Sequence, residues 1–252
     1  MVKVSKNLHL CVVMSDSYFP IYQNIFNRTL PREFDSVNIL HIRDHDSLPG
    51  FVGEYNFKMI NFKRLQFVAE NLLAHQGDNL LVLDIDAVFF RNFKDEVNTL
   101  LETKDMVFQH NPHYEHQPYC IATWGLQCSK KNINFFAEEV LPRSSALLKS
   151  SEEWEELVEK KVPLPDFYFS HRTGKQQHYD GDACVINTAI LESDLGKELK
   201  VELLPDTYTQ EFDGGPNVKN CVLYQSAGEA RGALERATHL VEMYEKIRKN
   251  IK

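Results

Sequence analysis

The sequence predicts an α/β fold in which helices flank a mixed, mostly parallel central sheet within a single domain. Three observations support this prediction. Apolar strands and helical stretches alternate over the first hundred residues, one apolar run suits a strand buried on both faces, and 252 residues suffice for one large domain. An apolar content of 43% and a charged content of 25% are ordinary for a globular protein, so neither a disordered nor a membrane-embedded chain is indicated.

The first half of the chain is predicted to alternate strand, helix, strand, helix, strand. Residues 8–14 form an apolar strand, and Ser15, Asp16 and Ser17 are suitable N-caps for a helix that extends to about Arg28. The remaining elements are a strand at 37–42, a helix at 57–75 that ends at Gly77, and a strand that begins at Asn79. This order is typical of βαβ units in a mostly parallel sheet.

The second half is less regular. Residues 105–109 are a predicted strand, and 131–140 and 151–161 are predicted helices, the second with a capping-box pattern at its start. Apolar residues at helical spacing predict an amphipathic C-terminal helix within 228–252.

Charge and cysteine usage restrict the function classes. A net charge of −8 argues against a dedicated nucleic-acid binder, which would have a basic face. The five cysteines are odd in number and form no Cys-x-x-Cys pair, which indicates reduced thiols in a cytoplasm-like compartment. The N-terminal apolar run is short and predicts a strand rather than a signal peptide, and no segment approaches the length of a membrane span. Membrane attachment is therefore not expected.

Two aspartates end the most apolar stretch of the chain. Asp84 and Asp86 follow the run NLLVL at 79–83, with one residue between them. Carboxylates beside a buried strand are costly unless a positive group compensates them, and Mg²⁺ or Mn²⁺ prefers such oxygen ligands. Because open α/β sheets bind ligands at the carboxyl ends of their strands, the pattern predicts a metal–phosphate site here. The alternative is a chance Asp-x-Asp string in which an aspartate only caps the next turn.

Several shorter motifs accompany the aspartates in a definite order. They are Ser15, Asp16 and Tyr18 after the first strand, Lys63-Arg64-Leu65 in the preceding helix, 88–92 (VFFRN), a predicted Gly-centred turn at Trp124-Gly125-Leu126, 180–187 (DGDACVIN) and 204–208 (LPDTY). With these motifs the chain resembles the GT-A-type glycosyltransferases of the nucleotide-diphospho-sugar transferase superfamily, and most of all their glycogenin/galactosyltransferase-like branch. The resemblance covers roughly residues 8–228 and implies a Rossmann-like GT-A fold.

The resemblance implies an organisation and a reaction. Residues 1–252 would be one catalytic domain, with a nucleotide-binding half to about 100, an acceptor-binding half at about 101–227 and the C-terminal helix at 228–252. The donor would be a nucleotide-sugar, above all a UDP-sugar, and the acceptor a hydroxyl of a glycan or glycoprotein. Mn²⁺ or Mg²⁺ would be the cofactor, and the protein would act in the cytoplasm of a bacterium or, if viral, of a host cell.

The resemblance also implies roles for individual side chains. Asp86 would bind the metal directly, and Asp84 would contact the ribose or bind the metal through water. Ser15, Asp16 and Tyr18 would hold the nucleoside, Lys63 or Arg64 the phosphates, and Trp124 and Gly125 would lie on the acceptor side. Asp180 or Asp182, with Asp182 slightly favoured, would bind acceptor hydroxyls or act as the base, or would lie beside the sugar in a retaining enzyme. Each group also has a structural alternative: a helix cap with a buried tyrosine, a solvated helix face, or a plain turn.

Two positions depart from the branch. The branch supplies a histidine near its C-terminal end as third metal ligand, but the comparable stretch here, 222–228 (VLYQSAG), has none, so the amide oxygen of Gln225 or a water would complete the shell. Gly181 stands where the branch has a glutamine in the Asp-Gln pair.

Two other function classes remain open at this point. The string Asp84-Ile85-Asp86-Ala87-Val88 fits the nucleophile motif of haloacid-dehalogenase-type phosphatases, in which the first aspartate attacks phosphorus. That motif normally lies on the first strand, and Ile186 stands where a second late aspartate is expected. A non-catalytic module that binds a nucleotide-sugar is the other alternative, and metal-dependent turnover of the nucleotide-sugar would exclude it.

Overall fold

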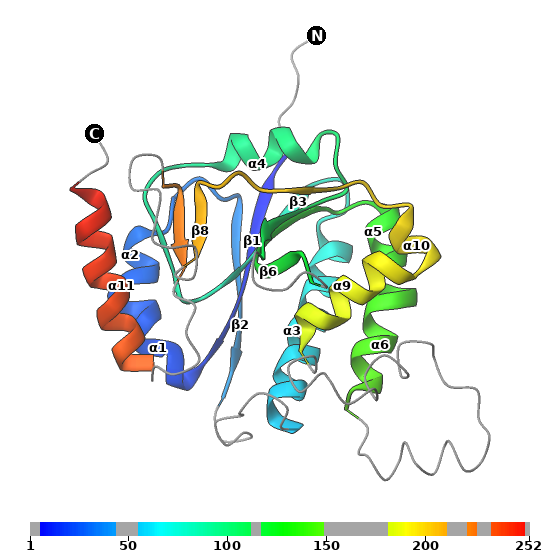
Figure 1. Cartoon of the computed structure of the whole chain (residues 1–252), viewed down its shortest axis with the longest axis horizontal. Helices are drawn as coiled ribbons and strands as arrows, with labels where there is room; N and C mark the ends of the chain where they lie inside the picture. Colours follow the sequence, from blue (N-terminus) through cyan, green and yellow to red (C-terminus); the bar gives the residue numbers. More distant parts are fainter. Residues whose placement is uncertain are drawn as a thin grey trace.

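The computed structural model describes residues 6–43, 55–111, 117–148, 181–210, 221–225 and 233–249. Its centre is a six-stranded sheet (Figure 1). The strands lie in the order β2 (Ser36–Ile42), β1 (Leu8–Ser15), β3 (Asn79–Asp84), β6 (Tyr119–Gln127), β5 (Met106–His110) and β7 (Val201–Leu203). β1 is parallel to β2 and β3, β5 is parallel to β7, and β6 is antiparallel to β3 and β5. The predicted mixed, mostly parallel sheet is confirmed.

A second sheet, of three strands, begins with the strand that follows β3 in the chain. Its order is β4 (Ala87–Phe89), β9 (Leu223–Gln225) and β8 (Tyr208–Gln210), with β4 antiparallel and β8 parallel to β9. Because β4 begins three residues after β3 ends, Asp84 is the last residue of β3 and Asp86 lies in the short link between the two sheets.

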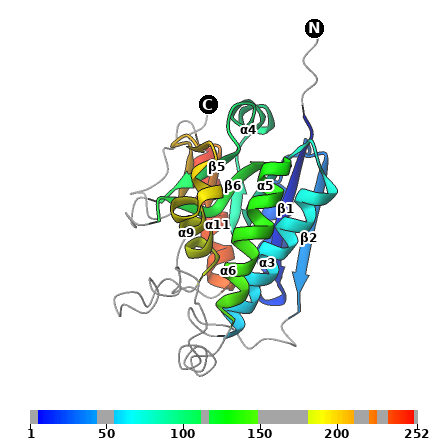
Figure 2. The ribbon, with the colours of Figure 1, turned by 90° about the vertical axis from the view of Figure 1, so that its right-hand side faces the viewer.

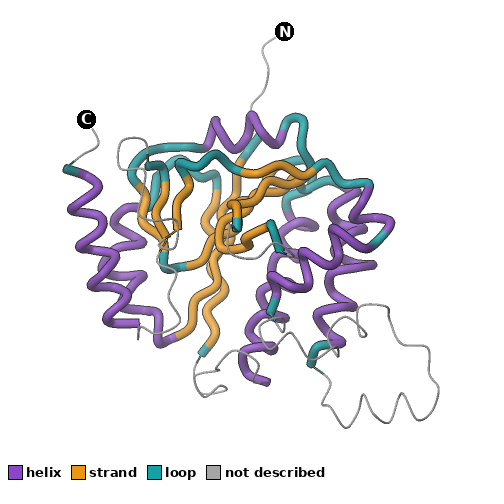
Figure 3. The backbone as a smooth tube through the Cα atoms, viewed as in Figure 1, coloured by secondary structure: helices purple, strands orange, loops and turns teal. Residues whose placement is uncertain are grey.

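Helices cover both sides of the large sheet (Figures 2 and 3). In chain order they are η1 (Asp16–Tyr18), α1 (Phe19–Ile21), the π-helical η2 (Tyr22–Phe26), α2 (Asn27–Thr29), α3 (Tyr55–Ala74), α4 (Lys94–Leu101), α5 (Lys130–Phe135), the π-helical η4 (Phe136–Val140), α6 (Leu141–Ala146), α9 (Asp182–Glu192), α10 (Asp194–Lys197) and α11 (Ala233–Arg248). α3 packs against α5, α6 and α9 on one side, and α11 packs against α1 and η2 at the other end of the molecule (Figure 1). Among the described residues no helix is both long and apolar enough to cross a membrane.

The β3 strand is apolar throughout because both of its faces are covered. Leu80 and Val82 belong to the apolar cluster that contains the α3 side chains, whereas Leu81 and Leu83 belong to the cluster on the opposite face. All four are buried. Successive strand residues point to opposite faces, so a strand between two helical layers needs apolar residues at every position, as the sequence predicted.

Most predicted elements are present, with specific differences. The strands at 8–14, 37–42, 79 onward and 105–109 and the helices at 57–75 and 131–140 are confirmed as β1, β2, β3, β5, α3 and α5–η4. The helix predicted at 131–140 continues through α6. The helix α4 and the strand β6 were not predicted. Ser15 occupies the N-cap position, but its hydroxyl bonds Ser17 Oγ and not the helix backbone. The predicted helix at 151–161 lies outside the described residues, and the C-terminal helix is described only as α11.

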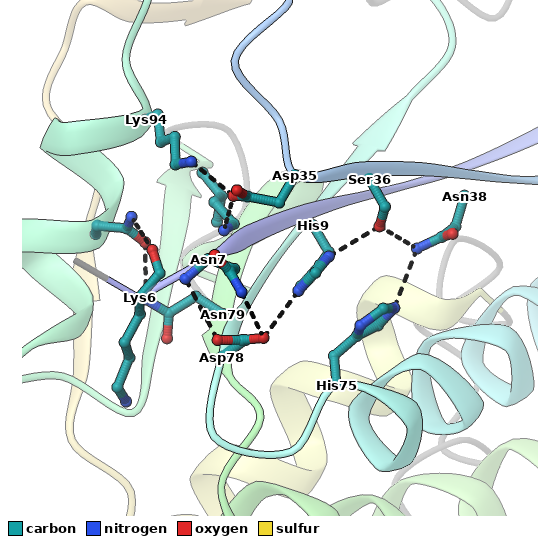
Figure 4. Close-up of polar contacts among 12 residues, drawn as sticks. Lys6, Asn7, His9, Asp35, Ser36, Asn38, His75, Asp78, Asn79 and Lys94 are labelled. Atoms are coloured by element: carbon teal, nitrogen blue, oxygen red, sulfur yellow. Dashed lines mark hydrogen bonds and ion pairs between the residues drawn. The ribbon is translucent and has the colours of Figure 1, made fainter. Parts of the chain in front are cut away.

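Polar side chains join the strands at the amino-terminal edge of the sheet (Figure 4). His9 lies 3.1 Å from Asp78 Oδ2 through Nε2 and 2.8 Å from Ser36 Oγ through Nδ1, and its ring stacks on His75 with centroids 3.7 Å apart. Asp78 also accepts from the backbone and side chain of Asn7. We call these five residues the amino-edge network; they satisfy one another and tie β1, β2 and the α3–β3 turn together.

All five cysteines have free thiols, and four of them are buried. Burial, above all, raises the pKa of Cys11 and of Cys128 to about 12, so both thiols stay protonated near neutral pH.

Candidate functional site

The carboxyl ends of the central strands bring the acidic residues to one edge of the sheet. β1 and β3 run parallel, with Val13 opposite Asp84, so both strands end at this edge. Asp86 follows in the link to β4, and Gln225 of β9 lies opposite Ala87 in the small sheet. The position agrees with the rule that open α/β sheets bind ligands where their strands end.

Arg64, on α3, connects two of the aspartates. Its Nη2 lies 2.8 Å from Asp84 Oδ1, and its Nη1 donates at 3.1 Å to Asp182 Oδ2 at the start of α9. Nη2 also donates at 2.7 Å to the carbonyl oxygen of Ile121 on β6. Because Arg64 is buried and its acceptors come from three different elements, it fixes α9 against the end of β3.

Asp86 is held by two other residues. Gln225 Nε2 donates at 3.1 Å to Asp86 Oδ1 and also at 3.1 Å to Asp84 Oδ2. Arg236 Nη1, from α11, donates at 2.7 Å to Asp86 Oδ2. The side chain of Asp86 is 8% exposed, whereas that of Asp84 is 37% exposed. Solvent therefore reaches Asp84, while Asp86 meets protein groups on all sides.

The site carries more negative than positive charge in a buried setting. Burial raises the pKa of Asp86, and the nearby Asp84 raises it further, although Arg236 and Gln225 partly oppose this shift. Burial also raises the pKa of Asp182 to about 6, against the opposing effect of Arg64. Burial by itself would lower the pKa of Arg64, but Asp84 and Asp182 together hold it above its ordinary value. An added cation would relieve the excess of carboxylates.

The donor atoms fit a hard divalent cation. Asp84 and Asp86 offer carboxylate oxygens, and Gln225 Oε1 is buried and accepts no hydrogen bond from a described residue. A half-turn of the Gln225 amide would exchange its Nε2 for this oxygen, and all three donors are of the type that Mg²⁺ and Mn²⁺ bind. Within the described part of the chain no third histidine, cysteine, aspartate or glutamate completes such a group, so Gln225 is the third candidate ligand.

The predicted nucleoside-binding residues divide into two groups. Tyr18 joins the site, because Arg236 Nη1 donates to its hydroxyl at 3.3 Å and the guanidinium lies over its ring, 5.6 Å from the centroid. Asp16 Oδ1 instead contacts His41 Nε2, near the end of β2, and Ser15 bonds Ser17. Ser15 is the last residue of β1 and Asp16 follows it, so both lie at the carboxyl end of the strand next to β3.

The structure separates other predicted residues from this site. Lys63 is half-buried and has no ion pair with a described residue, so Arg64 is the member of the basic pair that reaches the aspartates. Asp180 lies outside the described residues. Sequence reasoning missed Arg236 and His41; each lies on an element whose position relative to the aspartates follows only from tertiary packing.

The prediction of a Gly-centred turn at Trp124 and Gly125 is wrong. Both residues lie inside β6, and Trp124 is fully buried with its ring stacked between Phe108 and Phe136. A Cβ added to Gly125 would lie 2.9 Å from Val107 Cγ2. The glycine lets β6 approach the neighbouring side chains closely and does not form a turn.

Replacing Gly125 with alanine is therefore expected to destabilise the protein without affecting ligands. The added methyl group overpacks the core and should lower the free energy of unfolding by about 1–3 kcal/mol. Urea unfolding measures this change, and nucleotide-sugar affinity measured on the folded variant should equal that of the wild type. A variant of unchanged stability with altered acceptor use would restore the acceptor-side assignment.

The raised pKa of Asp182 predicts a dependence of stability on pH. A carboxyl whose pKa is higher in the folded than in the unfolded chain takes up a proton on folding, so its charged form destabilises the fold above about pH 6. The destabilisation disappears as the pH falls from about 6 toward the unfolded value of 3.8. Relative to the Asp182→Asn variant, the wild type should gain about 1–3 kcal/mol between pH 7.5 and pH 5.

Urea unfolding of both proteins across this pH range measures the difference. Groups such as His75 titrate in both proteins, so their contributions cancel in the comparison. If the free energies of unfolding of the two proteins change in parallel with pH, Asp182 is charged in the folded protein throughout the range.

Comparison with known proteins supports a fold assignment. No protein-family model and no curated protein matches the sequence. Among solved structures, a glycosyltransferase involved in the glycosylation of the major capsid of PBCV-1 matches with a TM-score of 0.50 and 10% identity, over 94% of this chain and 99% of that chain.

Two structures of the galactosyltransferase LgtC are also similar. One, a complex with donor and acceptor sugar analogs, has a TM-score of 0.49 and 11% identity over 95% of this chain and 99% of that chain. The other, an active-site mutant, has a TM-score of 0.49 and 12% identity over 93% and 95%. On the sheet topology and the first of the three matches, this chain has the GT-A glycosyltransferase fold that its sequence predicts.

Proposed function

We propose that this protein is a metal-dependent glycosyltransferase that moves a sugar from a nucleotide-diphosphate donor to a hydroxyl of a glycan or glycoprotein. One observation carries the proposal: at the carboxyl edge of a GT-A sheet, Asp84 is linked to Asp86 through Gln225 and to Asp182 through Arg64. Such a cluster suits a ligand that brings its own cation. A UDP-sugar is the donor class to test first, because the sequence most resembles the glycogenin/galactosyltransferase-like branch.

The donor side of the site is built from β1, β3 and the small sheet. Tyr18 offers an aromatic face to the base, and Ser15 and Asp16 offer hydrogen bonds to the nucleoside. Asp86, Asp84 and Gln225 Oε1 would hold Mn²⁺ or Mg²⁺, with Asp84 within reach of the ribose as well. A bound cation would stabilise the negative charge that develops on the departing diphosphate.

The acceptor side begins at Asp182. In the transfer, the bond between the sugar C1 and the diphosphate oxygen breaks, and a bond from the acceptor oxygen to C1 forms. The acceptor proton passes to a base, and the nucleoside diphosphate leaves with the bonding electrons. Asp182 is the carboxylate proposed at the reacting sugar, where a pKa of about 6 suits proton uptake near neutral pH. Arg64 positions Asp182 and Asp84 together.

The phosphatase alternative is not favoured. Its nucleophile belongs on the first strand, whereas Asp84 ends the third strand of the described chain, and both Arg64 and Gln225 bind its carboxylate. A non-catalytic binding module would use the same donor contacts and is separated from an enzyme by turnover.

A thermal-shift panel of nucleotide-sugars tests the proposal. A ligand that binds only the folded state raises its stability by about 2.7 kcal/mol at a hundred times its dissociation constant. At least one nucleotide-sugar, with UDP-sugars first, is expected to raise the melting temperature by several degrees in Mn²⁺ and by much less in EDTA. Mn²⁺-dependent release of the nucleoside diphosphate from that donor then distinguishes an enzyme from a binding module. The absence of any Mn²⁺-dependent shift would refute the proposal.

A further inference from the structure

The guanidinium of Arg236 binds the carboxylate of Asp86, which the proposed function assigns to the cation. Both oxygens of Asp86 have partners: Oδ1 accepts from Gln225, and Oδ2 accepts from Arg236 at 2.7 Å. The contact is well shielded from water, because the side chains of Arg236 and Asp86 are only 12% and 8% exposed. Charge-assisted hydrogen bonds of this length are the strong class of protein hydrogen bonds.

The same guanidinium also touches the proposed nucleoside site. Arg236 Nη1 donates to the hydroxyl of Tyr18 at 3.3 Å, and its Cζ lies 5.6 Å from the centre of the Tyr18 ring. A nucleoside diphosphate bound with its base at Tyr18 and its phosphates at a cation on Asp86 must span these two residues. Arg236 contacts both residues, so it lies within reach of a diphosphate held at Asp86.

Arg236 and a divalent cation cannot share Asp86 Oδ2 without strong repulsion. The guanidinium keeps its charge under all ordinary conditions, so it cannot yield by losing a proton. It can yield only by moving, and its planar fork of donors matches the oxygens of a phosphate as well as those of a carboxylate.

We propose that Arg236 is an exchangeable counter-ion: it pairs with Asp86 while the cation is absent, leaves Asp86 when the cation binds, and then binds the diphosphate of the donor. This inference rests on the proposed function and adds a donor-binding residue to it. The C-terminal helix α11 thereby becomes part of the donor site, in addition to packing on α1. It also explains how the buried carboxylate of Asp86 is tolerated before any ligand arrives.

The Arg236→Gln variant separates the two halves of the exchange. Without donor, the variant lacks the competing guanidinium and should bind Mn²⁺ about tenfold more tightly than wild type, a coupling of ordinary size between competing ligands. With Mn²⁺ saturating, the variant should bind UDP at least about tenfold more weakly, because a charged phosphate contact is lost. Mn²⁺ electron paramagnetic resonance measures the first affinity and calorimetry the second, and neither needs turnover.

Arg248→Gln is the matched control, because Arg248 lies on the same helix, is exposed and stacks on Tyr244 away from the aspartates. It should leave both affinities unchanged. If Arg236→Gln does not fold, as judged by circular dichroism, Arg236→Lys serves instead. Its ammonium keeps the charge but loses the fork, so Mn²⁺ binding should tighten by a smaller factor and UDP binding should weaken.

Two results would overturn the inference while the proposed function stands. One is that the folded Arg236→Gln variant binds Mn²⁺ with the affinity of the wild type. The other is that it binds UDP in the presence of Mn²⁺ with the affinity of the wild type. A wild-type protein that binds neither Mn²⁺ nor any nucleotide-sugar would instead overturn the proposed function, and the inference with it. The opposite changes in the two affinities exclude a purely structural role, since general loosening of α11 would weaken both.

Discussion

Replacing Asp86 with alanine is expected to abolish Mn²⁺-dependent donor binding while the fold survives. The carboxylate is the proposed direct ligand, and Gln225 with the partly exposed Asp84 would remain as an incomplete set. Loss of the cation removes several kcal/mol of stabilisation from the developing charge, so transfer should fall by about a thousandfold or more. Calorimetric titration with the donor found in the thermal-shift panel, with and without Mn²⁺, measures the binding loss.

The control for this variant is Asp194→Ala, which removes a solvent-exposed carboxylate from α10. It should bind donor and Mn²⁺ as the wild type does. Circular dichroism and a cooperative melt establish that the Asp86 variant is folded. If the folded Asp86→Ala protein keeps Mn²⁺-dependent binding of full strength, Asp86 does not belong to the metal site.

Replacing Arg64 with methionine is expected to cause the largest loss of stability among the site variants. Arg64 is buried and serves Asp84, Asp182 and the Ile121 carbonyl at once, so its removal leaves three acceptors without their donor. Breaking a buried ion pair by removing one partner costs about 3–5 kcal/mol, because a buried charge is left uncompensated. Urea unfolding at pH 7.5 measures the effect.

A second substitution tests this explanation. In the double variant Arg64→Met with Asp182→Asn, the uncompensated buried charge is neutralised, and about 0.5–3 kcal/mol of the loss should return as a coupling energy. Strictly additive effects would mean that the Arg64–Asp182 contact contributes nothing in solution. A loss of under about 1 kcal/mol for Arg64→Met alone would contradict the arginine's role in holding α9 to β3.

The sequence was sufficient for the parts of this molecule that depend on local pattern. Uninterrupted apolar residues in β3 and helical spacing in α3 reflect which faces are buried, and burial of this kind is visible along a single segment. Asp84 and Asp86 were identifiable because they break such a pattern where it ends. Gln225 was named because it offers an amide oxygen within the stretch comparable to the one that supplies the third ligand in the resembling branch, and the pairing of β9 with β4 brings it to the aspartates.

The remaining parts depend on contacts between distant segments. Arg236 lies 150 residues from its partner Asp86, and nothing in the mixed charge of α11 distinguishes this arginine from the exposed Arg248. Gly125 was misassigned because a glycine after a tryptophan has the composition of a turn. Only the neighbouring Val107 shows that the glycine is there for close packing.

The amino-edge network has a consequence for how the protein can diverge. Its polar groups bond one another at the end of β1 and β3 opposite to Asp84, so substitutions there are expected to change the stability of the fold without reaching the candidate site. Changes at His9, Ser36 or Asp78 would therefore tune fold stability, whereas a change of sugar specificity would require substitutions at the opposite edge, near Asp84. We expect the two properties to be able to evolve separately.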